Sequence, residues 1–286
     1  MSKILITGAT GQLGKATIAH LLKDMKPGNI VALARDANKA DFLKEKSIEV
    51  RVGDFDDTVS LDRAMQGIGK LLLISSSELQ RRFQQHKNVV DAAKKAGVKH
   101  IVYTSVSMKD VNTSAIKFLM ESHFQTEDYI KESGMNYTFL RNSLYAETIP
   151  MFVGENVLKT GIYLPAGNGE VSFAHRGEMG EATAKVLSTG HENKTYSLTN
   201  VETYSYRNVA QILSEISGKE ISYFSPEVED YTKTLSNAGV PKEYIGVFSG
   251  FALAIARGEF NMVSHDLESL LGRKPASLKE YLKTIY

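Results

Sequence analysis

Short apolar runs alternate with longer amphipathic stretches through the first half of the chain. The runs are rich in Val, Ile and Leu, which is typical of buried strands. They are KILIT (3–7), IVALA (30–34), IEVRV (48–52), KLLLI (70–74), KHIVYTS (99–105) and YTFLR (137–141). Each intervening stretch is long enough for a helical crossover, as parallel strands require. The pattern predicts an α/β fold with a doubly wound parallel sheet of Rossmann type.

The pattern changes near Tyr145, which suggests two parts. The first crossover, from Gln12 to Lys23, is a predicted helix with one apolar side. After Tyr145, residues 164–175 are turn-rich, GEMGEATAKVLS is helical in pattern and TYSLT is one more strand; four predicted helices follow, within 207–217, 226–239, 241–258 and 277–286. We expect a core of residues 1–145 and a smaller, mostly helical, substrate-binding part of residues 146–286. Roughly residues 160–200 should return to the main sheet.

Three glycines, Gly8, Gly11 and Gly14, follow the first apolar run and open the first helix. This strand-to-helix context is typical of dinucleotide binding. The first glycine permits a tight turn, the second lets the backbone approach a pyrophosphate, and the third lets helix and strand pack closely. Free N–H groups at the helix N-terminus then face the phosphates. We predict a nicotinamide dinucleotide here; an incidental strand-to-helix turn is the alternative.

The residues after the second and third apolar runs bear on which dinucleotide is bound. In NAD-selective sites an acidic residue about 20 positions after the glycine turn binds the ribose hydroxyls. Here Arg35 takes that place, with Asp36 behind it. Arginine binds phosphate bidentately, so Arg35 favours the 2′-phosphate of NADP(H), with NAD(H) still open. A solvated strand-end charge is the alternative for Arg35. Asp54 either contacts the adenine amino group or caps a turn.

Small hydroxyl residues follow the fourth apolar run, at Ser75–Ser77. At the carboxyl end of a strand they would line the crevice for the cofactor ribose and nicotinamide. Alternatively, Ser77 caps a helix that starts near Glu78. In the fifth run, Thr104 or Ser105 is a candidate for bonding nicotinamide or substrate, although residues within strands are core by default.

Together these segments resemble the NmrA-like branch of atypical short-chain dehydrogenases/reductases, and the chain looks most like NAD(P)H-dependent type 2 quinone oxidoreductases and triphenylmethane reductases. The likeness covers essentially the whole chain and is strongest in TGATGQLG, KLLLISSSE, AGVKHIVYTS, YTFLRNSLY and GHENKTYSLT. The resemblance implies cofactor contacts from the glycine turn, the strand ends and the segment after the sixth run: Gly8, Ala9, Thr10, Gly11, Gln12, Leu13, Arg35, Ser75, Ser76, Ser77, Leu140, Arg141, Asn142, Ser143, Leu144 and Tyr145.

Ordinary short-chain dehydrogenases protonate a carbonyl oxygen with a Tyr that has a Lys four residues later, and none of the 13 tyrosines here has that Lys. General acid catalysis contributes roughly 10² to 10⁴ in rate, so a simple ketone is a disfavoured substrate. A quinone that accepts hydride becomes a delocalised phenolate, and a triarylmethyl cation needs no proton. Positioning and a few hydrogen-bond donors then suffice. The sequence predicts reduction of quinones or similar planar conjugated acceptors.

Candidate catalytic residues follow from that chemistry. Asn142 and Tyr145 are the predicted hydrogen-bond donors, unless Asn142 only ties down a loop and Tyr145 only packs. His123 lies near the place where related enzymes carry their lysine, so it is a candidate to orient the nicotinamide ribose or donate a proton. A helix-surface histidine is the alternative. Four aromatic residues are candidates for the wall of a flat pocket, or else core: Phe118, Phe152, Phe248 and Phe251.

Composition mainly helps to exclude other kinds of partner and cofactor. Lys and Arg number 34 and Asp and Glu 33, so no strong field favours nucleic acid or a membrane. The chain has no cysteine, its seven histidines are dispersed, and no second dinucleotide motif is present, so we expect no metal and no flavin. The first apolar run is too short for a signal-peptide core. We expect a cytoplasmic monomer or homodimer that acts on a small aromatic molecule.

A regulator of the same family is the alternative function. Such a protein binds NADP(H), docks on a partner and performs no turnover, and the missing Tyr–Lys pair suits it equally. A sensor should bind oxidised and reduced cofactor with different affinities. An enzyme should have an apolar pocket beside the nicotinamide ring.

Overall fold

The chain folds into two compact units in the computed structural model, which describes residues 2–286. One unit comprises Met1–Val106, Glu121–Asn142 and Arg176–Tyr196, and the other Ser107–Met120, Ser143–His175 and Ser197–Tyr286. Three segments of each unit therefore alternate along the chain. The division of cofactor and substrate binding between the two units stays a prediction.

The first unit is built on a seven-stranded sheet, whose strands are β1 (Lys3–Ile6), β2 (Ile30–Ala34), β3 (Glu49–Val52), β4 (Ile68–Leu73), β5 (His100–Val106), β6 (Asn136–Asn142) and β9 (Lys194–Leu198). Their order is β3-β2-β1-β4-β5-β6-β9, and the pairs among β1 to β6 are parallel. The six apolar runs and TYSLT supply these strands, so the predicted doubly wound fold is confirmed. The strand order reverses between β1 and β4, where sheets of this kind bind ligands at their carboxyl ends.

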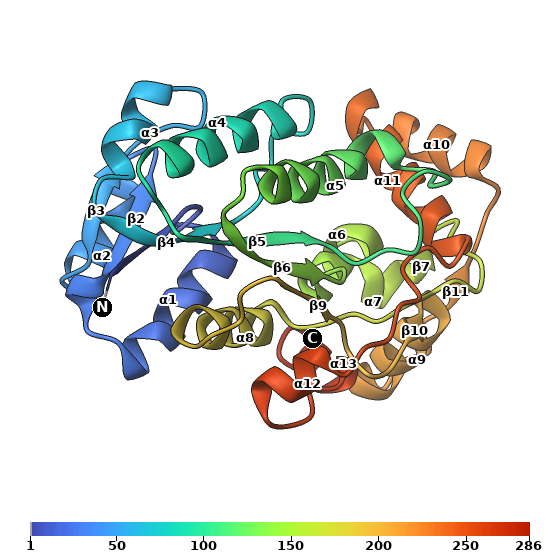
Figure 1. Ribbon diagram of the computed structural model, residues 1–286. Helices are drawn as coiled ribbons and strands as arrows, with labels where there is room; N and C mark the ends of the chain where they lie inside the picture. The colour runs from blue at the N-terminus through green and yellow to red at the C-terminus, as the bar shows by residue number, and fades with distance from the viewer. Residues whose placement is uncertain (1) are drawn as a thin grey trace. The chain divides into compact units, whose positions relative to one another are not determined.

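Helices cover both faces of this sheet, so β2 and β5 are buried along their whole length. Figure 1 shows α3, α4 and α5 along one face and α1 and α8 along the other. Their bounds are α1 (Gln12–Asp24), α3 (Thr58–Ala64), α4 (Arg82–Lys95), α5 (Lys117–Glu132) and α8 (Arg176–Ser188), with a short α2 (Asp41–Lys44) before β3. Helices α1 and α8 pack so closely that a Cβ on Gly180 would lie 2.6 Å from that of Ala16.

The second unit is mostly helical, as predicted. Its helices are α6 (Ile149–Val153), α7 (Val157–Thr160), α9 (Tyr206–Ser217), α10 (Val228–Asn237), α11 (Lys242–Ala256), α12 (Asp266–Leu271) and α13 (Leu278–Leu282). Two short sheets pair β8 (Glu170–Val171) with β10 (Tyr204–Ser205) and β7 (Ile162–Tyr163) with β11 (Tyr223–Phe224). Because β7 and β8 pair within this unit, the segment that returns to the first unit is 176–196, narrower than the expected 160–200.

Sequence periodicity predicted four helices of the second unit, now seen as α9, α10, α11 and α13. Ser205 and Ser277 cap α9 and α13, and each forms a capping box with the third helical residue. Helices α6, α7 and α12 were not predicted. None of the helices within residues 2–286 combines the length and the hydropathy that a membrane span requires.

Candidate active site

The glycine turn between β1 and α1 is tight. Gly8 has φ +58°, a conformation that side chains rarely adopt, and its carbonyl accepts a bond from Gly11 N at 2.9 Å. A Cβ on Gly14 would lie 2.3 Å from Gly8 O, so close packing there requires glycine. Gly11 is the N-cap of α1, and the first-turn N–H groups of Gln12, Leu13 and Gly14 have no helical acceptor. These groups suit a bound pyrophosphate.

The turn is joined to the end of β4. Thr7 Oγ1 accepts a bond from Ile74 N at 2.9 Å and donates to Leu72 O at 3.2 Å. A Cβ on Gly8 would lie 3.2 Å from that of Ile74. The glycine turn and the serine segment that follows β4 therefore meet where the strand order reverses. Within the turn, Ala9 is buried and Thr10 is half-buried.

Arg35 lies directly after β2, and its side chain is exposed. It forms no ion pair with any residue in the range 2–286. The aspartates around it hold local turns: Asp36 Oδ1 accepts from Asn38 N, and Asp54 Oδ1 accepts from Asp56 N, both at 2.9 Å. Asp54 thus takes the turn-capping role that the sequence left open, while the charge of Arg35 stays available to a ligand.

In the serine segment, Ser75–Ser77, one side-chain hydroxyl is hydrogen-bonded and the other two are available to a ligand. Ser75 N donates to Thr104 Oγ1 at 2.9 Å, so Thr104 holds the backbone of the segment. Ser76 Oγ donates to Gln85 Oε1 at 2.5 Å. Within the described part of the chain, the hydroxyls of Ser75 and Ser77 form no hydrogen bond. Ser77 is not a helix cap, because α4 begins only at Arg82.

Sequence reasoning missed three buried polar residues of α4: Arg82, Gln85 and His86. All three bond Ser76. Burial is the main reason that the pKa of His86 falls to about 3, and the nearby Arg82 charge adds to the effect. A signal did exist in the sequence. The apolar stripe of α4, Val89, Val90 and Ala93, continues towards the N-terminus at helical spacing onto these polar residues.

The end of β6 carries Leu140, Arg141 and Asn142, of which Leu140 and Asn142 are buried. The Arg141 guanidinium bonds Glu127 on α5 through two nitrogens, which raises its pKa. Because the guanidinium is engaged there, it is not available to a cofactor in this conformation. Asn142 is 5% exposed at the carboxyl end of the strand.

The next three residues, Ser143 to Tyr145, open a segment of the second unit. Ser143 N donates to Leu198 O at 3.0 Å, and its Oγ lies 3.2 Å from Ser172 Oγ. Leu144 O accepts from Ala174 N at 3.3 Å, and Tyr145 is half-buried. Ser143 and Leu144 therefore hold the backbone of this segment, and the role of Tyr145 as a hydrogen-bond donor stays a prediction.

His123 on α5 is buried, 7% exposed, rather than on a helix surface. Its Nδ1 lies 3.0 Å from the hydroxyl of Tyr103, which is fully buried. Burial lowers the pKa of His123 well below its ordinary value, and the charge of the nearby Arg82 adds to this. A neutral imidazole in the core has no spare proton near pH 7, so its surroundings give no support to the predicted role in proton donation.

The four aromatic residues predicted to form a pocket wall do not all lie together in the second unit. Phe152 packs edge-on against Phe248 and Phe251, with ring centroids 5.7 and 6.0 Å apart. Phe118 is 63% exposed and belongs to no such cluster among residues 2–286. Phe248 and Phe251 are half-buried. Three of the four predicted residues are thus brought together.

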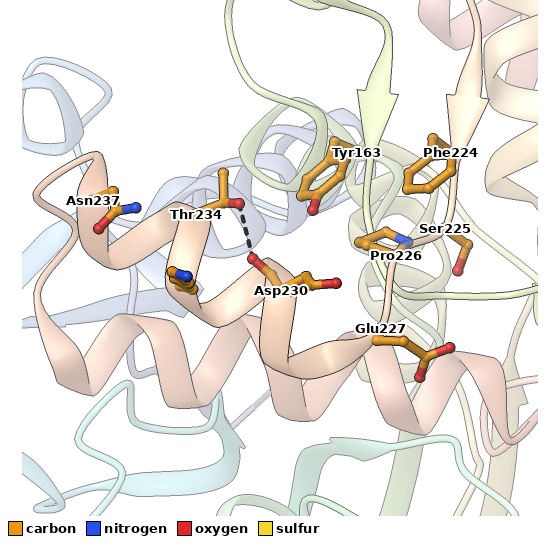
Figure 2. A pocket seen from close by; sticks show the side chains of 9 residues that line it. Tyr163, Phe224, Ser225, Pro226, Glu227, Asp230, Thr234 and Asn237 are labelled. Atoms are coloured by element: carbon orange, nitrogen blue, oxygen red, sulfur yellow. Dashed lines mark hydrogen bonds between the residues drawn. The ribbon is translucent and has the colours of Figure 1, made fainter.

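A separate groove of about 460 Å³ lies on the second unit, beside α10. Figure 2 shows Tyr163 and Phe224 near each other at one end of the groove, and the carboxylates of Glu227 and Asp230 also line it. The rings of Tyr163 and Phe224 are stacked, with their centroids 5.8 Å apart. None of the predicted site residues lines this groove. Over residues 2–286, no cluster of three His, Asp or Glu side chains has the geometry to hold a metal ion.

The strand order and the glycine turn at its reversal define a dinucleotide-binding protein of Rossmann type. The chain belongs to the NmrA-like family, which it matches over residues 1–284. This confirms the resemblance seen in the sequence.

Among its relatives, quinone oxidoreductase 2 of Escherichia coli is 36% identical over 285 residues, 99% of this chain and 98% of that protein. Two solved structures are also similar. The NADPH complex of the NADPH-dependent quinone oxidoreductase of Escherichia coli has 35% identity and a TM-score of 0.93, with 99% of each chain covered. The NADP(H) complex of Citrobacter sp. triphenylmethane reductase has 38% identity and a TM-score of 0.91, covering 99% of this chain and 100% of that one.

Proposed function

We propose that the protein is an NADPH-dependent reductase that transfers hydride to quinones or similar planar conjugated acceptors. The coarser class, an NAD(P)H-dependent oxidoreductase, is confirmed by relatives of that class that span the whole chain. The observation that carries the finer proposal is the exposed, unpaired Arg35 at the end of β2, next to the strand that leads into the glycine turn. A guanidinium there suits a 2′-phosphate.

The residues present fit this cofactor. The first-turn N–H groups of α1 would bind the pyrophosphate, Arg35 the 2′-phosphate, and the Ser75 and Ser77 hydroxyls the ribose near the nicotinamide. A Cβ at Gly14 would fill the space that the turn needs. When bound, the cofactor supplies the hydride. We propose that neither flavin nor metal takes part, since a conjugated acceptor can take hydride directly.

The acceptor chemistry follows from the groups at the strand ends. Burial raises the pKa of Tyr103, the opposite of what a tuned phenolic acid needs. Asn142 and Tyr145 would donate hydrogen bonds to the oxygen on which charge develops. A quinone spreads that charge over its ring, so these donors suffice without a strong acid. Phe152, Phe248 and Phe251 would form an apolar wall for a flat molecule.

We propose a cytoplasmic monomer or homodimer that acts on small aromatic molecules and binds neither nucleic acid nor membrane. The balance of 34 basic and 33 acidic residues supports this, because it creates no strong surface field.

The test is NADPH oxidation by the purified protein, followed by the loss of near-ultraviolet absorbance. The acceptors are a panel of quinones, a triarylmethane dye and an aliphatic aldehyde. We expect turnover with the quinones or the dye and none with the aldehyde. Efficient aldehyde reduction would refute the acceptor chemistry. Binding of NADP(H) with unequal affinity for its two forms, and no turnover with any acceptor, would instead identify the regulator.

A further inference from the structure

Three side chains of α4 bond every polar group of Ser76. Arg82 Nε donates to Ser76 O at 2.9 Å, His86 Nε2 accepts from Ser76 N at 2.9 Å, and Gln85 Oε1 accepts from Ser76 Oγ at 2.5 Å. Positions three and four apart share one face of a helix. We propose that Arg82, Gln85 and His86, the Ser76 clamp, are positioning residues that hold the serine segment in its cofactor-binding conformation. This inference rests on the proposed function.

The proton on His86 is fixed by its partners. A backbone N–H can only donate, so Nε2 is the bare acceptor and Nδ1 carries the proton. Nδ1 lies 2.9 Å from Thr126 Oγ1, and that hydroxyl donates to Ser122 O at 2.7 Å. The side chain of His86 is fully buried and therefore neutral. A directed chain of hydrogen bonds thus runs from Ser76 N through His86 to α5.

The clamp also reaches the segment after β3. Gln85 Nε2 donates to Asp56 Oδ2 at 2.8 Å, and Asp56 N donates to Asp54 Oδ1. Gln85 therefore links the segments that follow β3 and β4, two strands that β2 and β1 separate in the sheet. The Ser76 hydroxyl is bonded to α4, whereas the hydroxyls of Ser75 and Ser77 form no hydrogen bond within residues 2–286. Those are the two serines whose hydroxyls remain available to a ligand.

Packing alone does not require this arrangement. Arg82 and Gln85 are each 6% exposed and His86 is 0% exposed, and burial of polar side chains is costly unless they are bonded. An apolar face would cover a strand equally well. The serine segment, however, has left the β4 ladder, so its backbone N–H and C=O groups need other partners. The clamp supplies these partners for Ser76, as Thr104 does for Ser75 N, and together they fix a segment that has no strand geometry of its own.

The experiment compares two buried His–Thr pairs of the first unit. His86 bonds Thr126 beside the serine segment, while His100 Nε2 bonds Thr138 Oγ1 at 2.8 Å at the start of β5, the opposite edge of the sheet. His86→Leu removes the acceptor, His86→Gln offers an amide oxygen in its place, and His100→Leu is the matched control. The readouts are the NADPH Kd without acceptor, the melting temperature, and hydrogen exchange of the Ser76 amide in the free protein.

We expect His86→Leu to raise the NADPH Kd about tenfold or more and to speed exchange at Ser76, with His86→Gln restoring Kd to within about threefold of wild type. His100→Leu should lower the melting temperature but leave the Kd within about twofold, because it touches no part of the segment. The proposal that the clamp positions the serine segment is overturned if the NADPH Kd of His86→Leu is unchanged. It is also overturned if the Kd rises equally in His100→Leu.

Two further measurements keep the result decisive. If His86→Leu does not fold, Ser76→Ala replaces it: this variant removes the Oγ bonds to Gln85 and to Glu78 N, and an unchanged Kd then overturns the proposal. Turnover with quinones separates this inference from the proposed function. If wild-type protein binds NADPH but shows no turnover, the reductase proposal fails. The NADPH Kd of each variant relative to wild type then still tests whether the clamp positions the serine segment. Wild-type protein that does not bind NADPH overturns both.

Discussion

The guanidinium of Arg141 lies in a two-bond fork on the carboxylate of Glu127, with Nε to Oε1 at 2.9 Å and Nη2 to Oε2 at 2.6 Å. Glu127 is 1% exposed, whereas the Arg141 side chain is 35% exposed. The pair ties α5 to the last residues of β6, one position before Asn142. It therefore connects the core of the first unit to the strand end where we place a catalytic donor.

Arg141→Met should lower the free energy of unfolding by about 3 kcal/mol, the lower end of the range for breaking a buried pair, because Arg141 is partly exposed. The loss arises from the Glu127 carboxylate that stays buried without its partner. Urea denaturation measures it. Arg141→Met combined with Glu127→Leu should recover most of the stability, since no uncompensated charge remains. A double variant no more stable than Arg141→Met would contradict this account.

Arg35→Ala should weaken NADPH binding by about 1.5–3 kcal/mol and leave NADH binding nearly unchanged, because only NADPH carries the 2′-phosphate. Titration of the purified protein with each cofactor measures both affinities. Lys46→Ala, another exposed cation of the first unit, is the control and should not alter the ratio. Equal losses for both cofactors would remove the 2′-phosphate role from Arg35.

Asn142→Ala should lower kcat with quinone by about 10²-fold, the range for loss of one donor to a developing negative charge, with little change in the NADPH Kd. Tyr145→Phe tests the second donor in the same way and keeps the ring. Steady-state kinetics and cofactor titration separate the two effects. Full activity in Asn142→Ala would show that this side chain only supports the backbone.

Stability should depend on pH through His100, which is 3% exposed. Burial first, and then the charge of Lys70, lower its pKa from 6.5 to about 4. Between these values the unfolded chain binds a proton that the folded chain does not. The free energy of unfolding should therefore fall by about 1.4 kcal/mol per pH unit as the pH drops from 6.5 towards 4, and His100 should have no effect above 6.5.

Urea denaturation at pH 7 and pH 5 checks this prediction. His100→Gln should unfold with a shallower pH dependence than wild type, because the amide does not titrate. The same slope in both proteins would exclude His100 as the source. His86, with its pKa near 3, should act in the same direction.

Most of the sheet could be predicted from the sequence because strands such as β1, β2 and β4 contain short apolar runs, and helices cover both faces of the sheet. The glycine turn could also be predicted, since Gly8, Gly11 and Gly14 act within one local strand–turn–helix segment. Helix α12 was missed because DLESLL is too short for a helical period to show. Local patterns thus predicted local structure well.

The side-chain partners could not be predicted in the same way. Helical periodicity places Arg82 and His86 in line with the buried stripe of α4, but only the fold shows that Ser76 is their partner. Arg141 stands in a segment that the resemblance assigns to the cofactor, yet its guanidinium pairs with Glu127 on another element. Such pairings depend on distances across the sheet, and the spacing of residues along the chain carries no record of them.

The return of α8 and the start of β9 to the first unit bears on how this protein can be divided. Expression of residues 1–145 alone would leave the outer edge of β6 without its neighbour and strip α1 of the helix that meets it at Gly180 and Ala16. Exchange of the C-terminal half with that of a relative would cut through the same sheet. A working chimaera would need to keep residues 176–196 from the parent that supplies the glycine turn.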